Sequence, residues 1–302
     1  MEQHQNLTAR LQAAGIAYRE QEPLAAHTTF KIGGPAAVFV QPADEAQLCQ
    51  AVRLCRELAV PCYLLGNGSN ILFGDRGYAG AVISLAGMKG EVRREGNTLT
   101  APAGMPLSVL CTAALRAGLT GLEFAYGIPG TVGGAVYMNA GAYGGEMKDV
   151  LASVRYLTAE GQIVEAPAAE LDLGYRHSVF ESNGGCILSA AVRLAPGNPE
   201  AIAARMDDLM GRRRDKQPLD KPSAGSTFKR PVGAFAGALI EQCGLRGYRH
   251  GGAAISEKHC GFVVNLGGAT CADVLALCAE VQKIVKDQTG FTLEKEIRVV
   301  EL

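Results

Sequence analysis

The chain has 302 residues, enough for about two domains, and 48% of them are hydrophobic, as in ordinary globular proteins. Its 29 basic and 30 acidic residues leave a net charge of −1, which excludes the one-signed field that nucleic-acid or anionic-membrane binding needs. Glycine is enriched, at 38 residues against a usual share of about 7%. Such an excess is typical of tight turns and of backbone that closely approaches a ligand.

The nine cysteines do not indicate a disulfide framework, because their number is odd and no CxxC pair occurs. Cys49, Cys55, Cys271 and Cys278 lie on predicted helix faces, where a free thiol packs as a small hydrophobic group. The N-terminal residues lack an apolar signal segment. We therefore expect reduced cysteines in a cytoplasmic protein, and we expect a monomer.

The first half of the sequence predicts short strands and a few helices. The strand 36–40, the helix 43–58 and the strand 62–65 form one β-α-β unit, because apolar residues recur at helical spacing only in the middle segment. Further strands are expected at 81–85, 91–95, 98–102, 150–158, 162–165 and 186–194, with a helix at 106–117.

The composition changes at residues 195–199, which read APGNP, and we place a domain boundary there. Beyond it we expect helices at 200–214, 233–243 and 270–288, a Gly/Ser turn at 224–227, and strands at 262–265 and 297–301. The predicted domains are 1–197, with subdomains 1–75 and 76–197, and 198–302, with the last strand a candidate to return to the first domain. The fold class is α+β.

Two glycine-rich segments are candidate ligand sites. Residues 66–70, GNGSN, follow a strand but match neither a dinucleotide fingerprint nor a Walker loop, so they are either an anion-binding nest of N–H groups or a turn stabilised by Asn and Ser. Residues 124–145 carry no charge over the length of a membrane span, but their seven glycines and one proline predict a folded loop region instead. Two interpretations of this segment remain. Either a large flat ligand lies against its bare backbone, or it is a glycine-rich loop without a ligand.

No metal site is predicted, because the five histidines are scattered and have no paired ligand spacing. Three further segments place polar and charged residues together: 174–178, 224–230 and 293–297. Taken singly, their Arg176, Ser226 and Glu296 also suit a solvated surface. The run 212–216 suits an exposed helix face or a diphosphate.

Taken together, these segments resemble the UDP-N-acetylenolpyruvoylglucosamine reductase family. The resemblance is carried by seven collinear segments: HTTFKIGGPA (27–36), LGNGSNILF (65–73), IPGTVGGAVYMNAGAYGGE (128–146), GYRHSVF (174–180), SAGSTFKRP (223–231), GLRGYRHGGAAISEKHCGFVVN (244–265) and LEKEIR (293–298). Only 50 residues separate Arg176 from Ser226, which resembles the shorter family type that lacks an inserted subdomain and its substrate-binding tyrosine.

The resemblance implies a vanillyl-alcohol-oxidase-like FAD-binding domain followed by a smaller α+β substrate domain. It implies that residues of the two glycine-rich segments and one more glycine contact FAD: Gly66, Asn67, Gly68, Ser69, Asn70, Gly104, Ile128, Pro129, Gly130, Gly133, Gly134, Asn139, Gly141 and Ala142. Arg176, Ser226 and Glu296 would be catalytic, with Ser226 the acid. Tyr175, Arg213, Lys216 and Lys229 would bind the UDP-sugar substrate. Lys295 stands where the family often has proline.

The implied reaction suits these residue types. Flavin reduced by NADPH would deliver hydride to an enolpyruvyl group, Arg176 would stabilise the developing negative charge, and Ser226 would supply the proton. Glu296 would orient the hydroxyl or a water. Two alternatives remain at this point: another FAD-dependent oxidase or dehydrogenase of the same fold, and a catalytically silent flavin- or nucleotide-binding module. Peptidoglycan precursor synthesis is the expected role.

Overall fold

The structure is a computed structural model that describes residues 2–88 and 90–301. The chain folds into two compact units, each built from three segments. Unit 1 comprises Met1–Arg19, Val38–Asn67 and Ala81–Arg213, and unit 2 comprises Glu20–Ala37, Gly68–Gly80 and Arg214–Leu302. The predicted sequence boundary at residues 197 and 198 stays a prediction.

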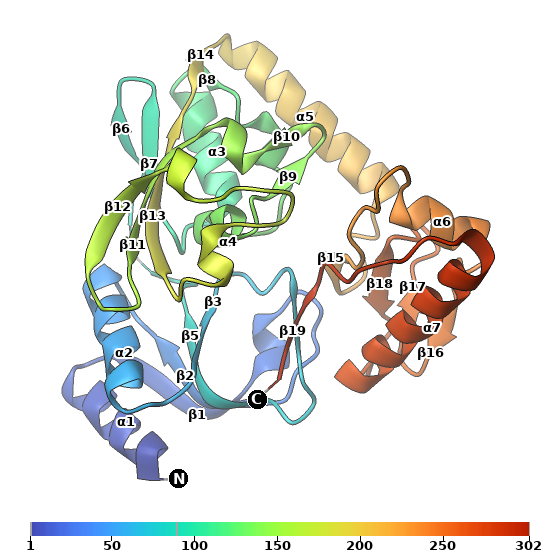
Figure 1. Ribbon diagram of the computed structural model, residues 1–302. Helices are drawn as coiled ribbons and strands as arrows, with labels where there is room; N and C mark the ends of the chain where they lie inside the picture. Colours follow the sequence, from blue (N-terminus) through green and yellow to red (C-terminus); the bar gives the residue numbers. More distant parts are fainter. Residues whose placement is uncertain (1, 89, 302) are drawn as a thin grey trace. The chain divides into compact units, whose positions relative to one another are not determined.

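Unit 1 contains a five-stranded antiparallel sheet of order β12-β11-β13-β7-β6 (Figure 1). Its strands are β6 (Arg93–Glu95), β7 (Thr98–Pro102), β11 (Leu151–Leu157), β12 (Ile163–Pro167) and β13 (Cys186–Arg193). The helices are α1 (Glu2–Ala13), α2 (Glu45–Glu57), α3 (Leu107–Arg116), α4 (Val132–Tyr137) and α5 (Pro199–Lys216), whose last residues belong to unit 2. Short pairs are formed by β8 (Leu119–Thr120) with β14 (Ala195–Pro196) and by β9 (Gly141–Ala142) with β10 (Gly145–Glu146).

The predicted strand–helix–strand succession at 36–65 is confirmed. It consists of β2 (Pro35–Gln41), α2 and β3 (Cys62–Leu65), and the Asp44 side chain caps α2 by accepting from Gln47 N at 2.9 Å. The two strands are not neighbours, however. In the sheet of order β1-β2-β5-β3, the strand β5 (Tyr78–Ser84) lies between them and runs parallel to β3, while β1 (Ala17–Pro23) takes the edge.

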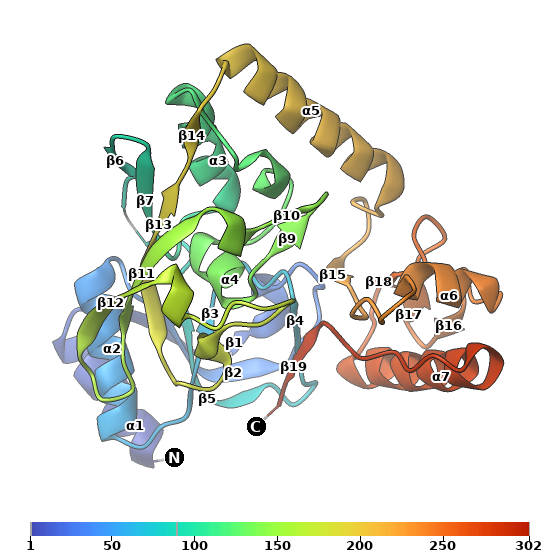
Figure 2. The same cartoon turned by 45° about the horizontal axis from the view of Figure 1, so that its top comes forward.

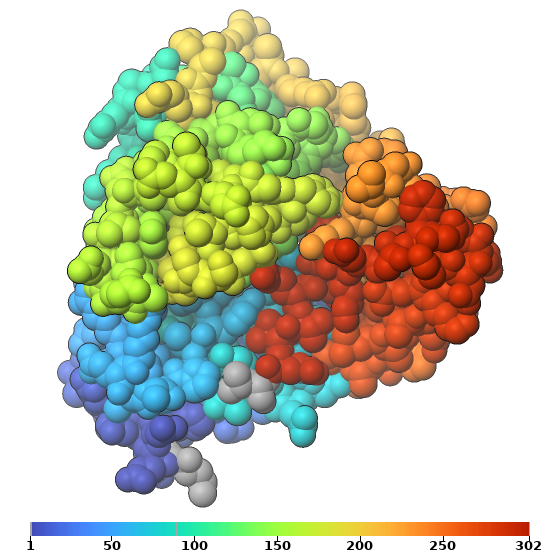
Figure 3. Space-filling model, in the orientation of Figure 1, coloured from blue at the N-terminus to red at the C-terminus, as the bar shows by residue number. Residues whose placement is uncertain are grey.

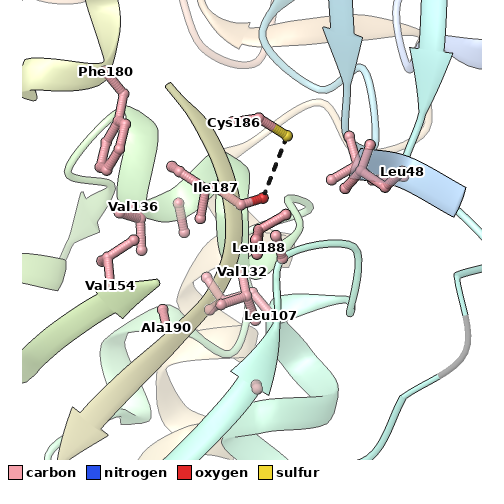
Figure 4. Close-up of a cluster of buried hydrophobic side chains, with 14 of the residues drawn as sticks. Leu48, Leu107, Val132, Val136, Val154, Phe180, Cys186, Ile187, Leu188 and Ala190 are labelled. Carbon is pink, nitrogen blue, oxygen red and sulfur yellow. Dashed lines mark hydrogen bonds between the residues drawn. The ribbon is translucent and has the colours of Figure 1, made fainter. Parts of the chain in front are cut away.

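The glycine-rich segment differs from the predicted loop, because part of it is helical. Val132, Ala135 and Val136 are buried on one side of α4, and Thr131 caps the helix by accepting from Gly134 N at 3.2 Å. Figure 4 shows Val132 and Val136 beside Ile187 and Leu188 of β13, and apolar burial therefore outweighs the poor helix propensity of two glycines.

Unit 2 is built on a four-stranded antiparallel sheet of order β15-β18-β17-β16. Its strands are β15 (Ser223–Ser226), β16 (Arg249–His250), β17 (Ala253–Ile255) and β18 (Phe262–Asn265). The helices α6 (Ala236–Gln242) and α7 (Cys271–Thr289) pack together, and α7 runs alongside β16 and β17 (Figure 2). Residues of the last part of this unit, red in Figure 3, are visible on its surface.

Two features of unit 2 differ from, or add to, the sequence predictions. Residues 223–226 form the strand β15 and not a turn, because they pair with β18 across a bulge. The expected final strand is β19 (Arg298–Val300), and it pairs in parallel with β4 (Ile71–Phe73).

All nine cysteines are free thiols. Within the described residues, no helix has both the length and the apolar character that a membrane span requires.

Candidate active site

The loop 66–70 follows β3, and the backbone donors of its first four residues lack acceptors among the described residues. Within the described residues, the N–H groups of Gly66, Asn67, Gly68 and Ser69 have no acceptor in the protein. Gly68 has a φ of +59°, and a Cβ there would lie 2.3 Å from the His27 carbonyl oxygen. Consecutive free N–H groups around a left-handed residue form an anion-binding nest, so this loop fits a pyrophosphate.

Glycine occurs near this loop for two different structural reasons. A Cβ on Gly66 would lie 2.6 Å from Thr131 Oγ1, one on Gly104 2.2 Å from Leu85 O, and one on Gly133 2.8 Å from Ala103 Cβ. These three glycines are therefore required by the protein's own packing. Gly134 is exposed, and its nearest neighbour would be Thr131 Oγ1 at 3.4 Å. Gly134 is thus the glycine of α4 that leaves bare backbone open to a ligand.

Asn67 and Asn139 use their side chains inside unit 1. Asn67 Nδ2 donates to Pro129 O at 2.6 Å, which ties the 66–70 loop to the segment of Ile128, Pro129 and Gly130. Asn139, predicted as a cofactor contact, is fully buried, and its Nδ2 donates to Glu146 Oε2 at 2.7 Å and to Gly174 O at 2.9 Å. Its side chain is therefore committed to holding the protein's own segments.

Arg176 lies in a tight turn of unit 1 and has a left-handed φ of +56°. Gly174 and His177 exchange backbone hydrogen bonds of 3.1 and 3.2 Å across this turn. The guanidinium donates to the Gly141 carbonyl at 3.3 Å and lies 5.0 Å from the centroid of the Tyr175 ring. The Arg176 side chain is thereby fixed next to the segment of Gly141 and Ala142.

Ser226 and Glu296 lie on neighbouring segments of unit 2. Between them, Thr227 O accepts from Glu296 N at 2.8 Å, and Asn70 Nδ2 donates to Glu296 O at 3.2 Å. The Ser226 hydroxyl has no hydrogen-bond partner within the described part of the chain. The structure therefore brings two of the three predicted catalytic residues together, with a serine hydroxyl left available. Arg176 belongs to unit 1.

The predicted substrate-binding residues differ in their surroundings. Tyr175 is exposed beside Arg176, and Lys216 is exposed at the end of α5. The Lys229 Nζ atom lies 3.7 Å from Glu294 Oε2. Arg213 is half-buried and has no acidic partner within the described residues, although the adjacent Arg212 pairs with Asp208 at 2.9 Å. Burial lowers the pKa of Arg213. The half-buried Arg213 guanidinium, with no carboxylate partner among the described residues, is therefore suited to binding an anionic ligand.

Sequence reasoning missed two threonines that hold segments near the predicted site residues. Thr131 caps α4 and contacts Gly66, and its place three residues before Gly134 was a readable capping signal. Thr227 is buried, and its Oγ1 accepts from Val263 N at 2.9 Å while its N–H donates to Gly261 O at 2.8 Å. No sequence signal marks Thr227, because its partners come from a distant strand.

Comparisons with known proteins indicate an FAD-binding family. A family model described as "FAD binding domain" matches residues 36–167, and one described as "UDP-N-acetylenolpyruvoylglucosamine reductase, C-terminal domain" matches residues 217–300. A relative from Lachnoclostridium phytofermentans named UDP-N-acetylenolpyruvoylglucosamine reductase is 49% identical and covers 92% of this chain and 91% of its own. One from Clostridium perfringens with the same name is 47% identical and covers 95% of both chains.

A solved structure gives the same result for the fold. The crystal structure of UDP-N-acetylenolpyruvylglucosamine reductase from Thermus caldophilus aligns with a TM-score of 0.79 at 36% identity, over 95% of this chain and 99% of that chain. The fold and the site therefore define an FAD-dependent oxidoreductase with an FAD-binding domain. The chain belongs to the UDP-N-acetylenolpyruvoylglucosamine reductase family.

These findings confirm the resemblance, the α+β fold class and the FAD cofactor expected from the sequence. They also decide between the alternatives, because a silent binding module and an unrelated oxidase of this fold do not account for relatives with this one name along almost the whole chain. The roles of individual residues stay predictions.

Proposed function

We propose that this protein reduces the enolpyruvyl group of UDP-N-acetylglucosamine enolpyruvate to give UDP-N-acetylmuramate, as a cytoplasmic monomer that supplies peptidoglycan precursors. NADPH is the reductant. The observation that carries the proposal is the Ser226 hydroxyl, which has no hydrogen-bond partner among residues 2–88 and 90–301 and lies on the segment next to Glu296. The names of the relatives support the substrate.

The residues of the two glycine-rich segments fit FAD. The free N–H groups of residues 66–69 would hold its pyrophosphate, and the exposed Gly134 would leave room for its ring. When bound, FAD supplies the hydride taken from NADPH to the methylene carbon of the substrate. The protein's part is to bind, to orient and to move the proton.

The stabilisation of negative charge and the donation of the proton are assigned to different residues. Hydride addition leaves negative charge on the carbon that bears the carboxylate, and the fixed Arg176 guanidinium stabilises this charge. The Ser226 hydroxyl donates the proton to that carbon, and Glu296 orients the hydroxyl or an intervening water. Arg213, Lys216 and Lys229 provide cations for the diphosphate, and Tyr175 an aromatic surface beside Arg176.

The test replaces Ser226 in the holoenzyme and measures the two half-reactions separately by stopped-flow flavin absorbance. Because general acid catalysis contributes about 10²- to 10⁴-fold, Ser226→Ala should slow reoxidation by the enolpyruvyl substrate at least about 100-fold. Flavin reduction by NADPH and FAD content should not change, since the hydroxyl takes no part in them.

Ser223→Ala is the matched control, because Ser223 begins the same strand β15. It should leave both half-reactions at their wild-type rates. If Ser226→Ala slows both half-reactions equally, the serine shapes the pocket and the proposed proton donation is wrong. Wild-type reoxidation in Ser226→Ala removes this residue from the mechanism.

A further inference from the structure

The segment that carries Arg176 is strained at two points. Asp172 and Arg176 both adopt left-handed backbone conformations, with φ of +46° and +56°, although neither is glycine. Such conformations are sparsely populated by residues with a Cβ and persist only where surrounding contacts hold them. The contacts of this segment therefore decide where the Arg176 guanidinium points.

Buried partners hold the two ends of the turn. Gly174 O accepts from Asn139 Nδ2 at 2.9 Å, and the fully buried Ser178 donates from Oγ to Tyr137 O at 2.7 Å.

His177 lies between Gly174 and Ser178, and both of its ring nitrogens have a carboxylate partner. Nδ1 lies 2.7 Å from Glu181 Oε2, and Nε2 lies 3.1 Å from Asp172 Oδ2.

We propose that His177 is a positioning residue for Arg176, and that its protonated ring bridges Asp172 and Glu181 to hold the strained turn in place. This inference rests on the role given to Arg176 in the proposed function. His177 immediately follows Arg176 in the chain, so the direction of the imidazole and the backbone conformation at Arg176 are set together. Asp172, the other strained residue, is fixed by the same ring.

The bridge needs the charged form of the ring. An imidazolium has two N–H donors and serves two carboxylates, whereas a neutral imidazole has one donor and would turn a lone pair toward the second carboxylate. Glu181 and then Asp172 raise the pKa of His177, and these are the charged groups that act on it from either side of the turn. The bridge is therefore complete below the raised pKa and is lost as the pH rises through it.

The effect belongs to the site rather than to the stability of the whole protein. The side chain of Asp172 is 81% exposed and that of His177 40% exposed, and exposed ion pairs contribute little to global stability. We therefore expect the loss of His177 to change the reaction step that uses Arg176, with little change in the unfolding transition.

The first experiment measures the half-reactions of His177→Gln holoenzyme by stopped flow between pH 6 and 9. Reoxidation by the enolpyruvyl substrate should be about tenfold slower than wild type at the low end of this range, and flavin reduction by NADPH should be unchanged. The wild-type advantage should decrease toward one as the pH rises. His250→Gln is the matched control, because it removes a similarly exposed histidine from its 2.9 Å pair with Glu280 and should change neither half-reaction.

A double-mutant cycle separates this inference from the proposed function. If His177 acts through Arg176, adding His177→Gln to Arg176→Lys should cost much less than tenfold in the reoxidation rate. Full additivity, or wild-type reoxidation in His177→Gln, overturns the positioning role while the function stands. If Arg176→Lys itself leaves reoxidation unchanged, the role proposed for Arg176 is wrong, and the inference that rests on it is also wrong.

The last experiment measures the pKa of His177 directly and does not depend on enzyme activity. A histidine NMR titration, with the His177 resonance assigned by its absence in His177→Gln, should give a pKa above the ordinary value. Asp172→Asn and Glu181→Gln should each lower it. A His177 pKa at or below the ordinary histidine value, unaffected by either variant, overturns the bridge.

Discussion

At the scale of single residues, Cys62 differs from the other thiols of this protein. It begins β3 and is partly exposed, whereas Cys55 near the end of α2 is fully buried. A hydrogen bond from the Cys55 thiol lowers the pKa of Cys62, burial opposes this, and the nearby Arg56 guanidinium adds to the lowering. Burial raises the pKa of Cys111 and of Cys186. The expectation of reduced cysteines that pack as small hydrophobic groups is therefore incomplete for Cys62.

We predict that iodoacetamide at pH 7.5 labels Cys62 in the native protein well before the seven buried cysteines. The thiolate is the reacting form, and the lowered pKa of Cys62 gives it a larger thiolate fraction at this pH than an ordinary cysteine has. Peptide mass spectrometry after timed quenching measures the order. The midpoint of its pH–rate profile should lie below that of an ordinary cysteine and should move upward in Cys55→Ala. Labelling of Cys62 no faster than that of the buried thiols contradicts the prediction.

At the scale of elements, α4 shows why adjacent glycines have different roles. Gly133 faces the protein, where its backbone packs against Ala103, and Gly134 faces outward with open space beside it. The sequence motif marks both as ligand contacts. Only the orientation of the helix, set by Val132, Ala135 and Val136 in the core, distinguishes the two positions.

We predict opposite stability effects for the two alanine variants of this helix. Gly134→Ala should stabilise the FAD-free protein by up to about 1 kcal/mol through helix propensity, and should weaken FAD binding by occupying bare backbone. Gly133→Ala should destabilise it by about 1–3 kcal/mol, because its Cβ would lie 2.8 Å from Ala103 Cβ. Urea unfolding and FAD titration measure both quantities. Full FAD affinity in Gly134→Ala would show that Gly134 is not part of the cofactor site.

At the scale of the whole molecule, the surface carries few large exposed apolar side chains. Val232 at 98% exposure and Phe235 at 59% are the most exposed large apolar side chains of the described residues, and the Arg230 guanidinium lies 3.9 Å from the centroid of the Phe235 ring. By themselves, two apolar side chains in one short loop bury far less than the roughly 800 Å² per partner that a stable interface buries.

We predict that the holoenzyme sediments at the mass of one chain at micromolar concentration, and that Val232→Asp leaves its sedimentation coefficient unchanged. Analytical ultracentrifugation over a hundredfold concentration range measures both. A concentration-dependent shift toward twice the mass contradicts the monomer. If Val232→Asp removes that shift, the loop of Val232 and Phe235 is the interface.

The sequence by itself determined the elements whose signals are local. The apolar spacing of 43–58 and the acidic residues at its start define α2, and the apolar run of 262–264 defines most of β18. The seven collinear segments determined the family, and with it the cofactor. That the loop 66–70 binds an anion stays a prediction, made from its glycines, its serine and its position after a strand, which are all local features.

Only the tertiary structure decided what depends on residues far apart in the chain. The helix α4 exists because its apolar side is buried against β13, and β15 is a strand because β18 supplies its hydrogen bonds. The pairing of β19 with β4, and the orientation of Asn139 toward Gly174, have no local sequence signature. Burial and hydrogen bonding between distant segments override local propensity, and those contacts form only when the whole chain has folded.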